Sequence, residues 1–170
     1  TDVKSIEKEP ELSWDVNVQG TINVLKVCKE LDKKIIFIST DYVFDGQKGN
    51  YLTTDCVNPI SNYAKSKTAA ELLVRTYNKS MIIRTSFFGH NFPYDAAFDD
   101  QWSSKDYVDV IAPKILNLVK TNKLGLFHVG EKRKTILQIA KKRAPNIRSI
   151  SRTQFSFKTP KDTSLGELYE

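Results

Sequence analysis

Residues 39–46 read Ser39-Thr40-Asp41-Tyr42-Val43-Phe44-Asp45-Gly46, and this stretch decides the fold class. It follows an apolar run, Ile35-Ile36-Phe37-Ile38, which predicts a buried strand. Thr40 then lies where that strand ends, and α/β proteins place their chemistry at the carboxyl ends of parallel strands. We therefore expect the Thr40 hydroxyl to belong to a functional site.

A second stretch, Tyr63-Ala64-Lys65-Ser66-Lys67, lies within a segment of helical spacing from about residue 62 to residue 77. Tyr63 and Lys67 are four residues apart, so both side chains emerge on one helical face. A free phenol has a pKa of about 10, and a nearby ammonium lowers that pKa by favouring the phenolate. The two stretches together predict a proton-donating site built from Thr40, Tyr63 and Lys67.

On these residues the chain resembles the extended short-chain dehydrogenase/reductases, and within them the dTDP-4-dehydrorhamnose reductases. The specific part is the eight-residue run with Tyr63 lying 23 positions after Thr40, because Tyr-x-x-x-Lys alone is common by chance. The resemblance implies NAD(P)-dependent reduction of a 4-keto group on a nucleotide-activated deoxysugar. It also implies NADP or NAD as the cofactor and a nucleotide sugar as the partner.

The resemblance assigns roles to four catalytic candidates. Tyr63 would protonate the developing alkoxide, and Lys67 would lower the Tyr63 pKa and hold the nicotinamide ribose. Thr40 would hydrogen-bond the substrate oxygen, and Asn17 would order a water that relays protons to Lys67. A simpler interpretation of Asn17 is a cap or cross-link within its own helix.

Four residues are the cofactor-side candidates. They are Tyr63, Lys67, Ser39 and Arg84. The stretch Arg84 to Gly89 resembles the strand and turn that pass the nicotinamide. Arg84 has an alternative role as the partner in an ordinary ion pair.

Helical and strand patterns alternate along the chain, which is typical of βαβ units and a parallel sheet. We expect helices near residues 9–31, 62–77, 107–119 and 135–143, and strands near 34–39, 81–85 and 126–129. A loop is expected from residue 90 to residue 104. In the first helix the predicted buried stripe is Trp14, Val18, Ile22, Leu25 and Cys28.

The expected fold is α/β, namely the C-terminal part of a Rossmann-like doubly wound parallel sheet with a small substrate-binding region. Residues 1–89 would form the second half of the NAD(P)-binding domain, and residues 90–170 the mixed substrate-binding region. None of the seven glycines forms the turn that cradles a dinucleotide pyrophosphate. Because the chain also starts at Thr1 rather than at Met, we expect the N-terminal dinucleotide-binding half to lie upstream, which would leave a strand edge exposed.

The composition argues against a membrane protein, a disulfide-rich protein and a metal site. At 40% hydrophobic residues the chain can pack a core, and no apolar run approaches the roughly 20 residues of a membrane span, so no membrane partner is expected. Cys28 and Cys56 suggest no disulfide framework, which makes a reducing cytoplasm the default compartment. With His90 and His128 they offer no close ligand pair, so no metal is expected.

The segment from Lys132 to Lys161 holds ten Lys and Arg residues and no Asp or Glu, within a net charge of +6. It could bind the diphosphate of a nucleotide sugar, contact nucleic acid, or form a solvated face. We interpret most of these basic residues as part of a solvent-exposed face. The absence of interleaved aromatics and of a recognised motif argues against a nucleic-acid partner.

Two other functions stay open from the sequence. One is a non-catalytic NADP-binding regulatory subunit, because the regulatory subunit of methionine adenosyltransferase resembles the same reductases. The other is a related extended enzyme such as a sugar-nucleotide epimerase. Only eight residues separate Phe92 from Gln101, fewer than the family usually has there, which leaves the sugar open. The oligomeric state is equally open, with a homodimer as one alternative.

Overall fold

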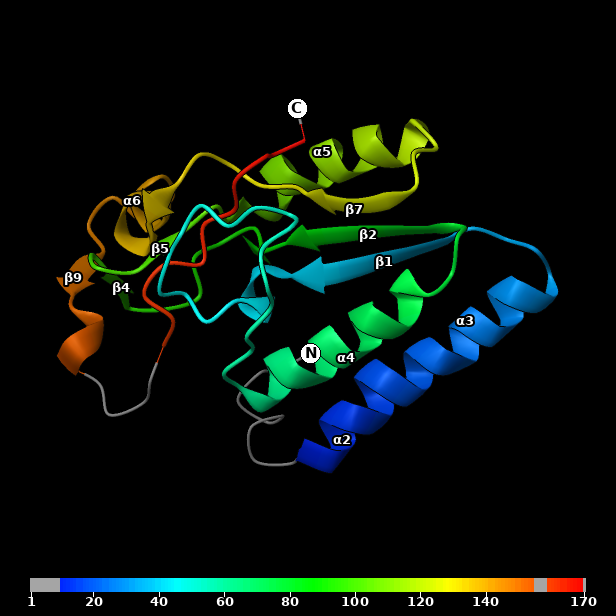
Figure 1. Ribbon diagram of the computed structural model, residues 1–170. Coiled ribbons are helices and arrows are strands. Elements are labelled where there is room, and N and C mark those ends of the chain that lie inside the picture. Colours follow the sequence, from blue (N-terminus) through cyan, green and yellow to red (C-terminus); the bar gives the residue numbers. More distant parts are fainter. Residues whose placement is uncertain (1–9, 155–158, 170) are drawn as a thin grey trace.

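The computed structural model describes residues 10–154 and 159–169. At its centre is a three-stranded parallel sheet in the order β1-β2-β7, formed by β1 (Ile35–Thr40), β2 (Ser80–Thr85) and β7 (Gly125–His128). Helices α3 (Gly20–Glu30) and α4 (Asn62–Arg75) lie on one face, and α5 (Val108–Lys120) lies on the other (Figure 1). The prediction of an α/β fold with a parallel sheet is confirmed.

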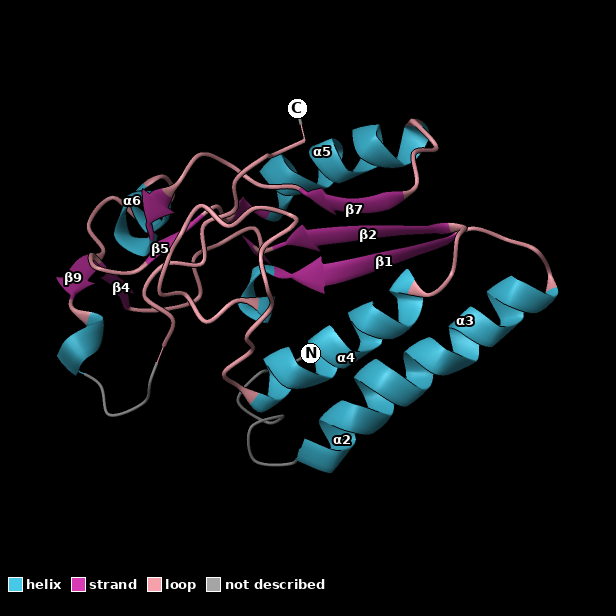
Figure 2. Ribbon diagram, in the orientation of Figure 1, coloured by secondary structure: helices cyan, strands magenta, loops and turns pink. Residues whose placement is uncertain are grey.

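Shorter elements gather at the carboxyl ends of these strands (Figure 2). They pair as three two-stranded sheets, joined by short helices and turns. The strand pairs are β3 (Phe87–Phe88) with β6 (Asp106–Tyr107), β4 (Ala96–Phe98) with β9 (Arg148–Ile150), and β5 (Trp102–Ser103) with β8 (Lys134–Thr135). The helical elements there are α6 (Ile136–Lys141) and the 3-10 turns η2 (Asp41–Val43) and η3 (Arg152–Gln154). Two further elements, α2 (Pro10–Trp14) and the π-helical turn η1 (Asp15–Gln19), lead directly into α3 beside α4.

Each face of the main sheet buries its own apolar cluster. Because side chains alternate along a strand, neighbouring β2 residues serve opposite faces: Ile82 packs toward α4, whereas Met81 and Ile83 pack toward α5. Burying one such side chain contributes about 1.5–3 kcal/mol. The α4 face gathers Leu25, Ile35, Phe37, Ala70, Val74 and Ile82, and the α5 face gathers Met81, Ile83, Ile111, Leu118 and Val129.

The apolar run in β1 is buried on one face only. Ile35 and Phe37 are buried under α4, but Ile36 and Ile38 remain 40% and 39% exposed. The reason is that α5 packs over β2 and β7 and, within the described ranges, no helix covers the same face of β1. β1 is also an edge strand, since only β2 pairs with it in the described part of the chain.

The first helix differs from its predicted stripe. Val18 and Leu25 are buried as expected, but Trp14 is 52% exposed and its neighbour Ser13 is buried instead. The π-helical turn that follows Trp14 fits an extra residue into the helix and so rotates the preceding residues about the axis. A regular period of 3.6 residues therefore does not predict which residues before Asp15 are buried.

Residues 90–104, expected as a loop, contain β4 and part of a second small sheet through β5. β7 and α5, which lie in the second predicted region, complete the main sheet and its outer face. The division at residue 89 stays a prediction. No helix among residues 10–154 and 159–169 is both long and apolar enough to cross a bilayer.

Gly46 lets the loop after β1 approach the C-terminal segment. Its φ is +77°, and a Cβ placed there would lie 2.4 Å from Cβ of Pro160. The Gly46 carbonyl also accepts a hydrogen bond from the Asp162 N–H at 2.8 Å. A side chain at this position would therefore strain the backbone and push the two segments apart.

We expect Gly46→Ala to lower the free energy of unfolding by about 1–3 kcal/mol, the usual cost of such a conformation. Urea unfolding monitored by circular dichroism measures the change. Gly89→Ala is the matched control, because nothing lies within 4 Å of a Cβ at that position, and a surface change of that kind stays within about 0.5 kcal/mol. Equal stability of the two variants would contradict the close-approach argument.

Candidate active site

Thr40 ends β1 and begins the turn η2. Its hydroxyl accepts a hydrogen bond from the Tyr42 N–H at 3.1 Å, and this bond caps the turn. The same hydroxyl donates to the Asp41 carboxylate at 3.3 Å and hydrogen-bonds the Tyr63 phenol. The strand end and the first turn of α4 therefore meet at Thr40 and Tyr63, as the sequence predicted for two residues 23 positions apart.

Tyr63 has a pKa raised to about 12. Burial is the largest cause, the charge of Asp41 adds to it, and the hydrogen bond with Thr40 opposes it. The sequence argument expected the Lys67 ammonium to lower this pKa, and in the structure burial prevails instead. At neutral pH the phenol is protonated, which is the state a proton donor needs.

Lys67 follows Tyr63 by one helical turn and faces β1. Its Nζ donates to the Ile38 carbonyl at 2.7 Å and lies 4.1 Å from the centre of the Phe37 ring. Burial lowers the Lys67 pKa to about 8, and the Glu71 carboxylate partly opposes that shift. An ammonium has three N–H donors, so one bond to Ile38 leaves donors for a ligand.

Asn17 lies in the π-helical turn η1, beside α4. Its Nδ2 donates to Ser66 Oγ at 3.0 Å, and Ser66 Oγ in turn donates to the Tyr63 carbonyl at 2.9 Å. Asn17 therefore reaches the backbone of the helix that carries Tyr63. The predicted water relay from Asn17 to Lys67 stays a prediction, and the side-chain bond to Ser66 supports a cross-link between two helices.

Ser39 and Arg84 meet at Glu71, a residue that the sequence argument missed. Ser39 Oγ donates to Glu71 Oε2 at 2.6 Å, and Arg84 Nη2 donates to Glu71 Oε1 at 2.6 Å. All three residues are buried, with Arg84 and Glu71 side chains 0% exposed. The contact of Ser39 or Arg84 with a cofactor stays a prediction, whereas the alternative of Arg84 as an ion-pair partner matches this geometry.

Asp41 is the second residue whose importance the sequence did not reveal. Its carboxylate accepts from Thr163 Oγ1 at 2.8 Å and from Ser103 Oγ at 3.2 Å. Burial raises the Asp41 pKa, and the nearby Lys105 ammonium opposes the shift. Asp41 thus joins the end of β1 to β5 and to the C-terminal segment.

Four of the ten basic residues from Lys132 to Lys161 form ion pairs within the molecule. Arg133 pairs with Asp162, Lys142 with Asp106, and Arg143 with Asp109, and Lys134 also lies near Asp106. These pairs connect α6 and its flanks to other segments. They support the interpretation of a structural, solvated face for this part of the stretch.

A hollow of about 720 Å³ borders the loop after β1 and the start of α4. Its size suits a nucleotide-sized ligand, and Arg152 and Lys161 bring positive charge to its lining. The guanidinium of Arg152 is held by a bond from Nη1 to the Thr159 carbonyl at 3.0 Å. The lining residues are Asp45, Gly46, Gln47, Ile60, Arg152, Thr159, Pro160 and Lys161.

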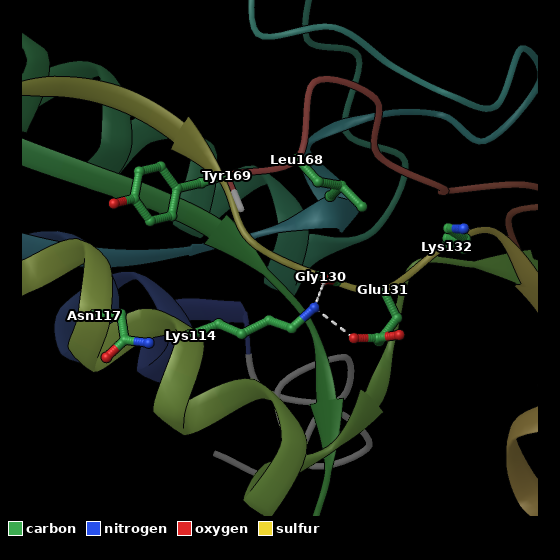
Figure 3. Close-up of a pocket in the computed structure, with 7 residues that line it drawn as sticks. All are labelled: Lys114, Asn117, Gly130, Glu131, Lys132, Leu168 and Tyr169. Carbon is green, nitrogen blue, oxygen red and sulfur yellow. Dashed lines mark hydrogen bonds and ion pairs between the residues drawn. The ribbon is translucent and has the colours of Figure 1, made fainter.

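A second hollow, of about 310 Å³, lies between α5, the segment after β7 and the C-terminal residues Leu168 and Tyr169 (Figure 3). Lys114 reaches into this region, but its ammonium already binds the Glu131 carboxylate and the Gly130 carbonyl. This hollow therefore does not carry the candidate site. Among the described residues no group of three or more His, Cys, Asp or Glu side chains could hold a metal ion.

Comparison with known proteins finds similarity to the family that the sequence resembles. The family model described as the RmlD substrate binding domain matches residues 1–160. The dTDP-4-dehydrorhamnose reductase of Aggregatibacter actinomycetemcomitans is 40% identical over 98 residues, which are 54% of this chain and 33% of that protein. A putative UDP-glucose 4-epimerase of Methanocaldococcus jannaschii is 26% identical over 99% of this chain and 55% of its own length.

Among solved structures, the dTDP-4-dehydrorhamnose reductase of Bacillus anthracis in complex with NADP matches with a TM-score of 0.85 and 28% identity. The match covers 97% of this chain and 68% of that one. The predicted Rossmann-like α/β fold and the resemblance to these reductases are confirmed. The chain spans between a third and about half of the curated relatives' lengths. It belongs to the RmlD substrate-binding domain family.

Proposed function

We propose that the protein containing this chain reduces the 4-keto group of a nucleotide-activated deoxysugar, with NADPH or NADH as reductant. The observation that carries the proposal is the Tyr63 phenol, held protonated by burial and hydrogen-bonded to Thr40 at the end of a parallel strand. A bound carbonyl oxygen near Thr40 would lie within reach of a proton donor. Relatives named as dTDP-4-dehydrorhamnose reductase support the choice of substrate class.

The chain's own residues fit a nicotinamide cofactor. Lys67 keeps N–H donors after its bond to Ile38, and these suit the ribose hydroxyls. When bound, the cofactor supplies a hydride to the carbonyl carbon. Tyr63 then gives its proton to the developing alkoxide, and Thr40 holds that oxygen in place.

The hollow beside Gly46 suits the rest of the substrate. A sugar nucleotide carries a diphosphate, and Arg152 and Lys161 place two cations in the lining. Ile60, also in the lining, precedes Tyr63 by only three residues. A substrate seated there would have its sugar end toward α4.

The test follows the absorbance of the reduced nicotinamide in the full-length protein with dTDP- and UDP-4-keto-6-deoxy sugars. We expect substrate-dependent oxidation of NADPH or NADH at a kcat on the order of 1–1000 s⁻¹. Binding of cofactor without oxidation would contradict the proposal and favour a non-catalytic role.

An epimerase is the rival function, and the match to a putative UDP-glucose 4-epimerase over nearly the whole chain is the observation that favours it. An epimerase returns the hydride to its substrate, so it shows no net oxidation of added cofactor. Conversion of UDP-glucose to UDP-galactose without such oxidation would decide for the epimerase.

A further inference from the structure

Glu71 lies at the centre of a buried network that joins α4 to two strands. Its Oε2 accepts from Ser39 Oγ on β1 at 2.6 Å and from Arg84 Nε on β2 at 3.1 Å, while its Oε1 accepts from Arg84 Nη2 at 2.6 Å. The carboxylate and the guanidinium are both completely buried. Three directional bonds thus fix one point of the helix against the sheet.

Glu71 lies on the same face of α4 as the helix residues of the candidate site. Tyr63, Lys67 and Glu71 follow one another at intervals of four residues, so they occupy one face of α4. On the strand side, Ser39 immediately precedes Thr40, the partner of Tyr63. Any slide or rotation of α4 that separates Glu71 from Ser39 also moves Tyr63 relative to Thr40.

Stability alone does not account for the network. A buried ion pair loses the hydration of both ions, and well-packed apolar residues in its place are often equally stable or more stable. The apolar contacts of α4, through Ala70 and Val74, are not directional and permit small shifts. The directional bonds of Glu71 are what restrict the helix to one register.

We propose that Glu71 is a positioning residue for the reaction: through Ser39 and Arg84 it sets the placement of Tyr63 and Lys67 against Thr40. This inference rests on the proposed function. It assigns Ser39 and Arg84 to the support of the site rather than to the cofactor. A misplacement of about 1 Å is enough to reduce a rate about 100-fold.

The test compares Glu71→Leu/Arg84→Met with the wild-type, full-length protein. The double variant removes both charges together, so no unpaired ion is left in the core. We expect kcat, measured at saturating NADPH, to fall at least 10-fold and the Kd for NADPH to rise, because Lys67 moves together with Tyr63, while the KM for the sugar nucleotide changes less than threefold. A double variant that folds and keeps kcat within twofold would overturn the proposal, and so would a loss confined to NADPH affinity.

Two further variants keep the test decisive. Lys114→Met/Glu131→Leu removes an ion pair between α5 and the segment after β7, and it should leave kcat unchanged. If the first double variant does not fold, Ser39→Ala removes only the β1 bond of Glu71 and leaves its pair with Arg84. We expect about a threefold to tenfold loss of kcat at saturating NADPH, and wild-type kcat would refute the role of Glu71.

The wild-type assay judges the proposed function separately. If the wild-type protein turns over no sugar nucleotide, the proposed function has failed, and the positioning role is judged by geometry. Crystal structures of the wild type and the first double variant then give the distance from Tyr63 Oη to Thr40 Oγ1. A change of about 1 Å or more supports the positioning role, and an unchanged distance rejects it.

Discussion

Tyr63→Phe is expected to reduce kcat about 10²–10⁴-fold, the usual contribution of general acid catalysis. The substitution removes the hydroxyl that is proposed to donate the proton and leaves the ring in place. The phenol hydrogen-bonds Thr40, and the loss of a bond of this kind should lower the free energy of unfolding by about 1 kcal/mol. Steady-state kinetics with the sugar substrate, together with thermal unfolding, measure both effects.

Tyr77→Phe provides the matched control. Tyr77 follows the end of α4 and its hydroxyl donates to the Lys33 carbonyl at 3.0 Å, away from Thr40. That variant loses one hydrogen bond of similar strength but no proton donor. We expect it to retain wild-type kcat. A Tyr63→Phe protein with near wild-type turnover would remove the general-acid role.

Lys67→Met is expected to weaken both cofactor binding and rate. A hydrogen bond from a charged donor contributes about 1.5–3 kcal/mol, so the Kd for NADPH should rise about 10- to 100-fold. Fluorescence titration with NADPH measures the affinity, and kcat is measured at saturating cofactor. Lys65→Met is the control, because Lys65 lies on the same helix with its side chain exposed. Unchanged NADPH affinity in Lys67→Met would exclude the ribose contact.

The same residue predicts a pH dependence. Burial lowers the pKa of Lys67 to about 8, so the ammonium is present below that pH and lost above it. In the wild type, kcat/KM should therefore fall as the pH rises through about 8, while Tyr63, with a pKa of about 12, remains protonated. Lys67→Met should lack this basic limb. A wild-type profile that stays flat to pH 10 would contradict the assignment.

The spacing of apolar residues was sufficient to predict the main strands and the central helix of this fold. The apolar runs before Thr40 and before Thr85, and the helical spacing after Ser61, predicted β1, β2 and α4 to within one or two residues. The sequence also predicted that Thr40, at a strand end, and Tyr63, on a helical face, belong to one site, and the two side chains are hydrogen-bonded in the structure.

Other features left no readable pattern in the sequence. Strands of two or three residues, such as β5 and β9, are too short to show an alternation. Glu71 was overlooked because an acidic residue on a helix is usually exposed, and only the tertiary contact with Arg84 makes its burial tolerable. Its spacing of four residues from Lys67 was the available signal. The pKa of Tyr63 depended on burial, which a linear sequence does not report.

The bond from Thr163 to Asp41 has a consequence for the order of assembly during translation. The two residues are 122 positions apart, so the ribosome must add all the intervening residues before this carboxylate can gain that partner. Long-range closures of this kind are typical of slow steps in folding. On a nascent chain the sheet can form around β1 and β2 early, but the contacts of Asp41 next to Thr40 are completed late.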